Sequence, residues 1–172
     1  RTNMTFNLIE KILKECAKGG VYSIRLSWRG ELTLNPKWLE TIRMAKNLGI
    51  KEVSTLTHGF KLTFFFFEKI TKAGIDWITI SIDGVGETYN KIRKPLKFQE
   101  LLQKIKDIKK YKDENNLKKP VLKIQGIWPA IEKNPEEYYK LFSPLVDLVA
   151  FNPLIDYLCR DEEIEYLDDF AC

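Results

Sequence analysis

The chain has 172 residues, enough for one domain with a substantial core and little room for a second. Hydrophobic residues make up 44% of it and charged residues 30%, a balance that excludes disorder over most of its length. No apolar run approaches the roughly 18 residues of a membrane-spanning helix, and no secretory signal opens the chain. Because its three cysteines, Cys16, Cys159 and Cys172, form no C-x-x-C pair, we expect a protein of the reducing cytoplasm without disulfides or a self-contained metal site.

Charge is unevenly distributed, although the net charge is only +4. Residues 91–123 hold 12 basic and 4 acidic side chains, and residues 156–172 hold 7 acidic and 1 basic. A basic run can indicate a nucleic-acid surface. Here, however, lysines interleave with leucines and isoleucines at helical spacing, which indicates the solvated face of an amphipathic helix, so we expect neither a nucleic-acid nor a membrane partner. These lysines are Lys104, Lys106, Lys109, Lys110 and Lys112.

Helix-period and strand-like segments alternate along the chain. Thr5 is expected to cap a first helix that Gly19-Gly20 ends. Asn35-Pro36 and Asn134-Pro135 are expected to cap and begin later helices. In chain order, the predicted segments are a helix over 5–18, a strand over 22–28, a helix over 36–48, a strand over 53–57, a helix over 63–73, a strand over 77–82, a helix over 96–111, a strand over 121–128, a helix from 135 and a strand over 146–151.

The repeated strand–helix–strand order predicts right-handed crossovers and a single parallel sheet, which is an α/β fold. The first helix has no strand before it, and the chain begins with Arg1 rather than a methionine. We therefore expect a first strand upstream and interpret the chain as a fragment.

Small and polar residues directly follow the predicted strands. In parallel βα folds, ligands bind beyond the carboxyl ends of the strands, where the loops converge. The carboxylate, hydroxyl and amide groups found there suit a polar ligand that carries an ammonium or a ribose. The residues at these positions are Gly30, Glu31, Thr57, His58, Gly59, Ser81, Asp83, Gln125 and Asn152.

Three of these segments together resemble the motifs of radical S-adenosylmethionine (SAM) enzymes. Residues 24–34, IRLSWRGELTL, resemble the strand and G-G-E-P-L-L loop of that family, and residues 56–62, LTHGFKL, resemble its T-N-G-x-x-L turn. Residues 80–84, ISIDG, with Ile92-Arg93 after them, resemble its S-x-D-G…I-R segment. The tail over 169–172 resembles the run into the SPASM extension, where a cysteine opens the ligand set of an auxiliary iron–sulfur cluster.

The resemblance implies a partial (βα) barrel of the radical SAM type over residues 1–153, with its first strand missing. Residues 154–172 are then an acidic linker leading to a truncated SPASM-like extension. It also implies a 4Fe-4S cluster, SAM, an electron donor such as flavodoxin or ferredoxin, and reductive cleavage of SAM to a 5′-deoxyadenosyl radical that abstracts hydrogen from a substrate. The substrate, whether peptide, protein or small molecule, stays open.

The family's cluster loop, C-x-x-x-C-x-x-C, does not occur in the sequence. Cys16 lies in the middle of a helix on its apolar face, where we expect it to be part of the core. This fragment alone is therefore expected to be inactive.

The resemblance further assigns roles to individual residues. Gly30 and Glu31 would meet the ammonium of SAM, through a backbone carbonyl and a side chain respectively. Arg93 would pair with the SAM carboxylate, for which its planar fork is suited. For the remaining residues, Ser81 and Asp83 would lie near the ribose or carboxylate, Thr57 and Gly59 would shape the loop, Gln125 and Asn152 would lie by the sugar or adenine, and Cys172 would be a ligand of the auxiliary cluster.

Two other classes remain open. One is a different βα-barrel lyase or isomerase, in which Glu31 and Asp83 perform acid–base or metal chemistry. The other is a non-catalytic scaffold that binds a peptide or protein, with exposed side chains among Phe64–Phe67 as its candidate surface.

Overall fold

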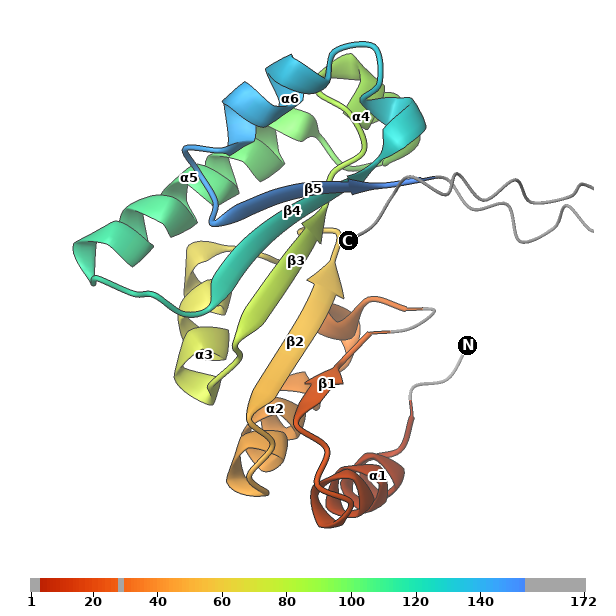
Figure 1. Cartoon of the computed structure of the whole chain (residues 1–172), viewed down its shortest axis with the longest axis vertical. Coiled ribbons are helices and arrows are strands. Elements are labelled where there is room, and N and C mark those ends of the chain that lie inside the picture. The colour runs from red at the N-terminus through yellow and green to blue at the C-terminus, as the bar shows by residue number, and fades with distance from the viewer. Residues whose placement is uncertain (1–3, 28–29, 154–172) are drawn as a thin grey trace, which may run out of the picture.

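The computed structural model describes residues 4–27 and 30–153 (Figure 1). It contains five parallel strands in one sheet, in the order β1-β2-β3-β4-β5. Because every crossover returns to the adjacent strand, the sheet winds in one direction, like the wall of a barrel and unlike a doubly wound sheet. The predicted α/β fold with a parallel sheet is confirmed. The strands are β1 (Ser23–Arg25), β2 (Glu52–Thr57), β3 (Trp77–Ser81), β4 (Val121–Ile127) and β5 (Leu148–Asn152).

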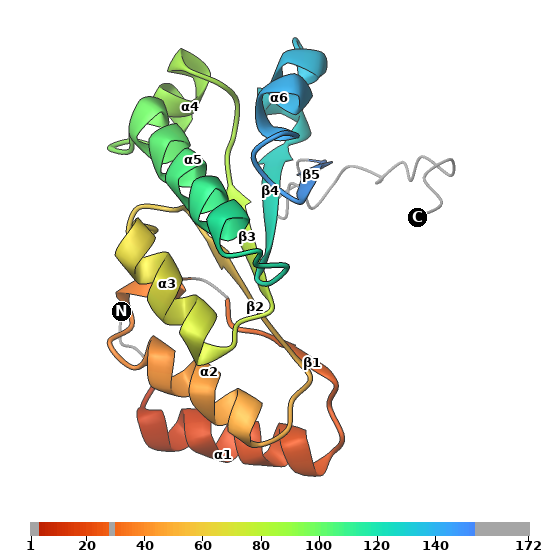
Figure 2. The ribbon, with the colours of Figure 1, turned by 90° about the vertical axis from the view of Figure 1, so that its left-hand side faces the viewer.

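The helices cover one face of this sheet. Figure 2 shows α1, α2, α3 and α5 side by side in front of the strands, and α6 adjoins α5 through Phe98 and Phe142, whose ring centroids are 6.2 Å apart. No helix within residues 4–27 and 30–153 is long and apolar enough to cross a membrane. The helices are α1 (Phe6–Lys18), α2 (Trp38–Asn47), α3 (Phe64–Ala73), α4 (Glu87–Ile92), α5 (Phe98–Glu114) and α6 (Pro135–Phe142), with short 3-10 turns η1 (Leu32–Leu34) and η2 (Trp128–Ala130).

Side chains alternate across each strand, so the sheet has an apolar face and a polar face. The face toward the helices carries Val53, Ile78, Ile80, Leu122 and Ile124, each at most 1% exposed. Burial of each such side chain between the sheet and the helices stabilises the fold by about 1.5–3 kcal/mol. We call the opposite face, on which no described helix packs, the open face. Its polar side chains are Ser23, Arg25, Glu52, Ser54, Thr79, Ser81, Lys123 and Gln125.

The start of α2 differs from the prediction. The helix begins at Trp38, and the Asn35 side chain instead accepts the N–H of Lys37 at 2.9 Å, closing a turn before the helix. The prediction for Asn134 is confirmed, because its side chain accepts the N–H of Glu137 at 3.3 Å and caps α6.

Two other segments also differ. The sequence predicts a polar turn after β3, but the structure has the additional helix α4 there, whose six residues are too few to show a helical period. The following helix, α5, extends to Glu114, beyond its predicted end. It stops where Asn116 takes a left-handed backbone conformation with φ 51°.

An ion pair at the amino-terminal edge of the sheet fixes the end of α5. Lys112 Nζ lies 2.5 Å from Asp147 Oδ2 and donates to the carbonyl of Pro120 at 2.7 Å, and the same Asp147 oxygen accepts the N–H of Leu122 at 2.7 Å. Lys112 is only 5% exposed, so its assignment to the solvated face of the helix is wrong. The other apolar and basic positions of α5 follow the predicted amphipathic pattern, with Leu101, Leu102, Ile105 and Ile108 buried.

Asp76 forms an equivalent set of hydrogen bonds before β3, two strands away from Asp147. Its Oδ2 accepts the N–H of Val53 at 2.9 Å and Nζ of Lys46 at 2.8 Å, and its Oδ1 accepts Nζ of Lys119 at 2.6 Å. Burial by itself raises the pKa of the Asp76 carboxyl. The hydrogen bonds from Lys119, Lys46 and Val53 outweigh burial and hold that pKa below its usual range.

The hydrogen bonds of the Asp76 carboxylate predict a pH-dependent contribution to stability. A carboxyl whose pKa is lower in the folded state stabilises the protein above its unfolded pKa of about 3.9, and this contribution is lost as pH falls through the folded pKa. We expect Asp76→Asn to lower the free energy of unfolding by about 1–3 kcal/mol at neutral pH, with a deficit that shrinks below about pH 4. Urea unfolding of both proteins over this pH range measures it. Asp107→Asn, on the exposed side of α5, is the control and should change stability by less than about 0.5 kcal/mol. A deficit that is constant with pH would contradict the ionic role.

Candidate functional site

The predicted site residues lie at the edge where the carboxyl ends of the strands meet. The structure separates them into two groups. In the first group, the residues are engaged by hydrogen bonds within the chain itself, through the side chain or, at Gly59, through the backbone; these residues are Glu31, Thr57, Gly59, Asp83 and Arg93. In the second group, the residues are at least partly accessible; these residues are Gly30, Ser81, Gln125 and Asn152.

Glu31 connects the loop after β1 to the end of β2. Its Oε1 accepts the Thr33 hydroxyl and the Thr57 hydroxyl, each at 2.7 Å, and the Thr33 N–H at 3.3 Å. Its Oε2 accepts the N–H of His58 at 3.0 Å. These donors occupy both oxygens of a side chain that is only 9% exposed. In the structure, the Glu31 side chain therefore holds this loop in place. Its contact with the ammonium of SAM stays a prediction.

His58 is the second partner of Glu31. Its Nδ1 accepts the N–H of Phe60 at 3.1 Å, so the neutral ring carries its proton on Nε2. That Nε2 lies 3.4 Å from Glu31 Oε2. The sequence does not reveal this pairing, because Glu31 is 27 positions away from His58 and only the parallel pairing of β1 and β2 brings the two together.

Gly59 allows the loop after β2 to sit directly on α5. It has φ 81°, and a Cβ there would lie 2.5 Å from Cδ1 of Leu101. Any side chain would thus both strain the backbone and collide with the helix. The N–H of Gly59 also donates to the Thr57 hydroxyl at 3.1 Å, so both residues shape this loop from inside the protein.

Asp83 performs a similar task at the end of β3. Its Oδ2 lies 2.7 Å from Nε and 2.5 Å from Nη2 of Arg93, and its Oδ1 accepts the N–H of Ile127 at 3.1 Å. Asp83 is only 4% exposed. The pair therefore ties the end of β3 to the end of β4 and to α4, and a contact of Arg93 with the SAM carboxylate remains a prediction.

Two tyrosines lie close to this ion pair. The hydroxyl of Tyr138 donates to the carbonyl of Ile82 at 2.8 Å. Burial raises the pKa of Tyr138 above its ordinary value and that of Tyr89 to about 12. Both phenols are therefore neutral at physiological pH, and neither is suited to act as a base.

Ser81 and Gln125 are neighbours on the open face. They are paired in the register of β3 and β4, and both are half-buried. Asn152 follows on β5, paired with Ile127, and is exposed. Within the described part of the chain, no side-chain hydrogen bond engages these three residues, so their polar groups are available to a ligand.

Further polar residues of the open face were not among the predicted site residues. The prediction considers only positions near the carboxyl ends of the predicted strands and beyond; the residues it omits are Ser23, Arg25, Glu52, Ser54, Thr79 and Lys123. The sequence does contain a pattern that could have identified Lys123. Lys123 lies between the apolar residues Leu122 and Ile124, which is the alternation expected of a strand with one polar face.

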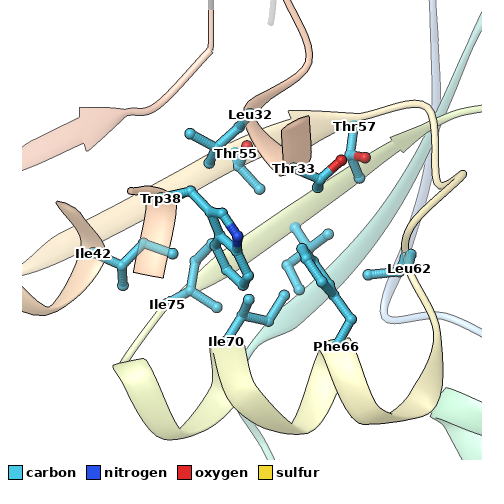
Figure 3. A pocket seen from close by; sticks show the side chains of 11 residues that line it. Leu32, Thr33, Trp38, Ile42, Thr55, Thr57, Leu62, Phe66, Ile70 and Ile75 are labelled. Atoms are coloured by element: carbon cyan, nitrogen blue, oxygen red, sulfur yellow. The ribbon is translucent and has the colours of Figure 1, made fainter. Parts of the chain in front are cut away.

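A small apolar cavity lies on the other side of the sheet, between β2 and helices α2 and α3 (Figure 3). Trp38 and Phe66 stack across it with ring centroids 4.3 Å apart. Its threonine hydroxyls are already engaged: Thr55 donates to the carbonyl of Leu26 at 3.0 Å, and Thr57 donates to Glu31. This cavity is part of the core behind the Glu31 loop, and the hydroxyls of Thr55 and Thr57 are not free for a substrate.

Metal ligands are not assembled here. Across residues 4–27 and 30–153, no three His, Cys, Asp or Glu side chains are grouped so that they can hold a metal ion. Cys16 is half-buried and packs against the core, as predicted. Cys172 and the predicted extension over 154–172 lie outside the described residues. The described residues therefore do not supply the ligands of a 4Fe-4S cluster.

Comparison with known proteins identifies the class. A family model described as the radical SAM superfamily matches residues 1–118, more than half of the chain. The chain belongs to the radical SAM superfamily, a superfamily of enzymes. The match ends before residues 119–172, so the SPASM subtype stays a prediction.

Individual relatives refine this only in part. A protein named "Probable GTP 3′,8-cyclase" from Saccharolobus islandicus is 34% identical over 100 residues, which cover 58% of this chain and 31% of that protein. The protein of the same name from Saccharolobus solfataricus is 35% identical over 96 residues, or 55% of this chain and 30% of that protein. The matched part is thus about a third of the length of these relatives. A solved structure, BtrN in complex with AdoMet and 2-DOIA, is 17% identical with a TM-score of 0.48, covering 60% of this chain and 40% of that one.

Proposed function

We propose that the whole protein is a radical SAM enzyme that binds SAM at the carboxyl edge of the open face. The observation that supports this most directly is the adjacent pair Ser81 and Gln125, whose side chains are free of other described partners on that face. Adjacent strands are about 4.8 Å apart, so a hydroxyl and an amide are presented side by side. Such a pair can donate to and accept from ribose hydroxyls or an adenine ring.

The proposal divides the work among the predicted residues. Ser81, Gln125 and Asn152 contact the cofactor directly, and the exposed backbone at Gly30 receives its ammonium. Glu31 holds the loop that carries Gly30, through the bonds to Thr33, Thr57 and His58 described above. SAM supplies the hydrogen-abstracting chemistry when bound, and this chain's residues orient it.

The substrate and the partners belong to the same proposal. The similarity to proteins named GTP 3′,8-cyclase makes GTP the first substrate to assay, ahead of peptides or proteins. An electron donor such as flavodoxin or ferredoxin, and a SPASM-type auxiliary cluster with Cys172 as a ligand, complete the proposed protein.

The test is SAM binding and cleavage by the anaerobically purified full-length protein with its iron–sulfur cluster. We expect 5′-deoxyadenosine to form when dithionite is added. Gln125→Leu should raise the Kd for SAM by about 5–10-fold, because the loss of one or two hydrogen bonds of about 0.5–1.5 kcal/mol each gives a factor of this size. Equilibrium dialysis with labelled SAM measures it.

Gln103→Leu is the matched control, because Gln103 lies on the exposed side of α5 and bonds only to Asp107, at 2.8 Å. Its Kd for SAM should equal that of the wild type. Equal weakening by both variants would contradict the proposed placement. Absence of 5′-deoxyadenosine despite an intact cluster would count against the enzyme and favour the non-catalytic scaffold.

A further inference from the structure

Lys123 occupies an unusual position on the open face. It lies in the middle of β4, between the buried residues Leu122 and Ile124, and its register neighbours are Thr79 on β3 and Leu148 on β5. The alternation of the strand turns Lys123 away from the helices. It is half-buried, and partial burial of an ammonium is unfavourable unless a partner compensates the lost hydration.

Other lysines near the sheet have such a partner. Lys46 and Lys119 pair with Asp76, and Lys112 pairs with Asp147. Among residues 4–27 and 30–153, no carboxylate lies within ion-pair distance of Lys123.

The open face carries a second cation. Arg25 lies on β1, and its register neighbour on β2 is Ser54. The strands also contribute one carboxylate to this face, Glu52, whose oxygens accept the Ser23 hydroxyl at 2.8 Å and Trp77 Nε1 at 3.0 Å. These neutral donors leave its negative charge in place, but no ion pair in the described part of the chain joins Glu52 to Arg25 or Lys123. The face therefore carries two cations, neither of which has a carboxylate partner among the described residues.

We propose that Lys123 and Arg25 bind anionic groups of the substrate on the open face, nearer the amino-terminal ends of the strands than the proposed SAM site. This inference rests on the proposed function, since it places the substrate on the same face as SAM. The strand register sets Lys123 two residues nearer the carboxyl edge than Arg25, about 7 Å along the strands. The two residues lie three strands apart in the sheet order.

An extended anion fits this diagonal arrangement better than a single compact one. A polyphosphate chain has several charges along its length, which the point charge of a lysine and the planar fork of an arginine can each bind. Of the hydroxyls on the strands between the two cations, that of Ser54 donates to the carbonyl of Ile24 at 3.2 Å and Thr79 is only 5% exposed, so the proposal rests on the two cations themselves.

The experiment uses inorganic tripolyphosphate as the probe, with the full-length protein and isothermal titration calorimetry at low salt. We expect the wild type to bind it and Lys123→Met to weaken binding at least 10-fold, whereas Lys123→Arg should retain binding. Lys106→Met is the control, because Lys106 is exposed on α5 and its loss changes the net charge equally. The Kd for SAM should stay within about twofold of the wild type in every variant.

The outcomes separate this inference from the proposed function. Loss of tripolyphosphate binding in Lys123→Met with SAM binding intact supports the site, and citrate binding with the same dependence on Lys123 would assign it to carboxylates as well. Absence of tripolyphosphate binding by the wild type, or equal weakening in Lys106→Met, overturns the site. A large loss of SAM affinity in Lys123→Met also overturns it, because Lys123 would then hold the cofactor. If neither the wild type nor any variant binds SAM, the proposed function is contradicted rather than the anion site alone.

Discussion

Phe67→Ala is expected to lower the free energy of unfolding by about 3–5 kcal/mol, the usual range for emptying a fully buried aromatic site. Phe67 is 0% exposed and is among the largest fully buried side chains of the chain's described part. It reaches from α3 into the core, and its ring meets that of Tyr111 on α5 edge to face at 6.2 Å. Because α2, α3 and the sheet are held apart by their other side chains, the vacated space cannot close completely, which adds to the lost transfer energy. Urea unfolding at neutral pH measures the change.

The matched control is in the same run of four phenylalanines. Phe65 is 60% exposed, and its ring lies 4.1 Å from Nζ of Lys69. Phe65→Ala should lower the free energy of unfolding by less than about 1 kcal/mol, since an exposed cation–π contact contributes little. Similar losses in the two variants would contradict the orientation of α3 in the structure.

This run also bears on the non-catalytic alternative. From the sequence, two of the four phenylalanines are expected to face the sheet and two to face solvent or a neighbouring element. In the structure, Phe67 is in the core, Phe66 stacks on Trp38 at 4.3 Å, and Phe64 meets Tyr111 at 4.9 Å. Most of the aromatic surface is thus used inside the protein, and Phe65 remains as its most exposed member.

The fold was predictable because its signals are local. The strands β2 to β5 alternate or are continuously apolar over five to seven residues, and helix stops such as Gly74, with φ 91°, are marked by single residues. The incorrectly predicted segments contain residues that can form either of two local structures, and the sequence does not show which one forms. Asn35 can cap a helix or close a turn, and its closing a turn became evident only from the bond to Lys37.

The site was predictable in position but not in its internal contacts. Parallel strands place their carboxyl ends at one edge, so the sequence locates the residues that gather there. Whether a carboxylate faces a ligand or its own chain depends on donors far away in sequence: Glu31 meets His58, and Asp83 meets the N–H of Ile127, 44 positions later. No spacing rule reports such partners, and this is why the sequence treats Glu31 and Asp83 as ligand contacts when the structure shows both oxygens of each engaged.

Asp83→Ala is the second large expected loss. It leaves the guanidinium of Arg93 without its partner and the N–H of Ile127 without an acceptor. Breaking a fully buried ion pair by removing one member costs about 3–5 kcal/mol. The Arg93 side chain is 30% exposed and regains some hydration, so we expect about 2–4 kcal/mol, measured by urea unfolding.

A double-mutant cycle shows whether this loss comes from the pair. In Asp83→Ala with Arg93→Met, the unpaired charge is gone, so the double variant should be more stable than the sum of the single losses implies, with a coupling of about 1–3 kcal/mol. Additive losses would contradict the pairing. The same variants distinguish a positioning role from direct cofactor contact. If Asp83 only joins β3, β4 and α4, the double variant should recover part of its SAM affinity along with its stability. If Asp83 or Arg93 itself contacts SAM, stability returns and the affinity does not.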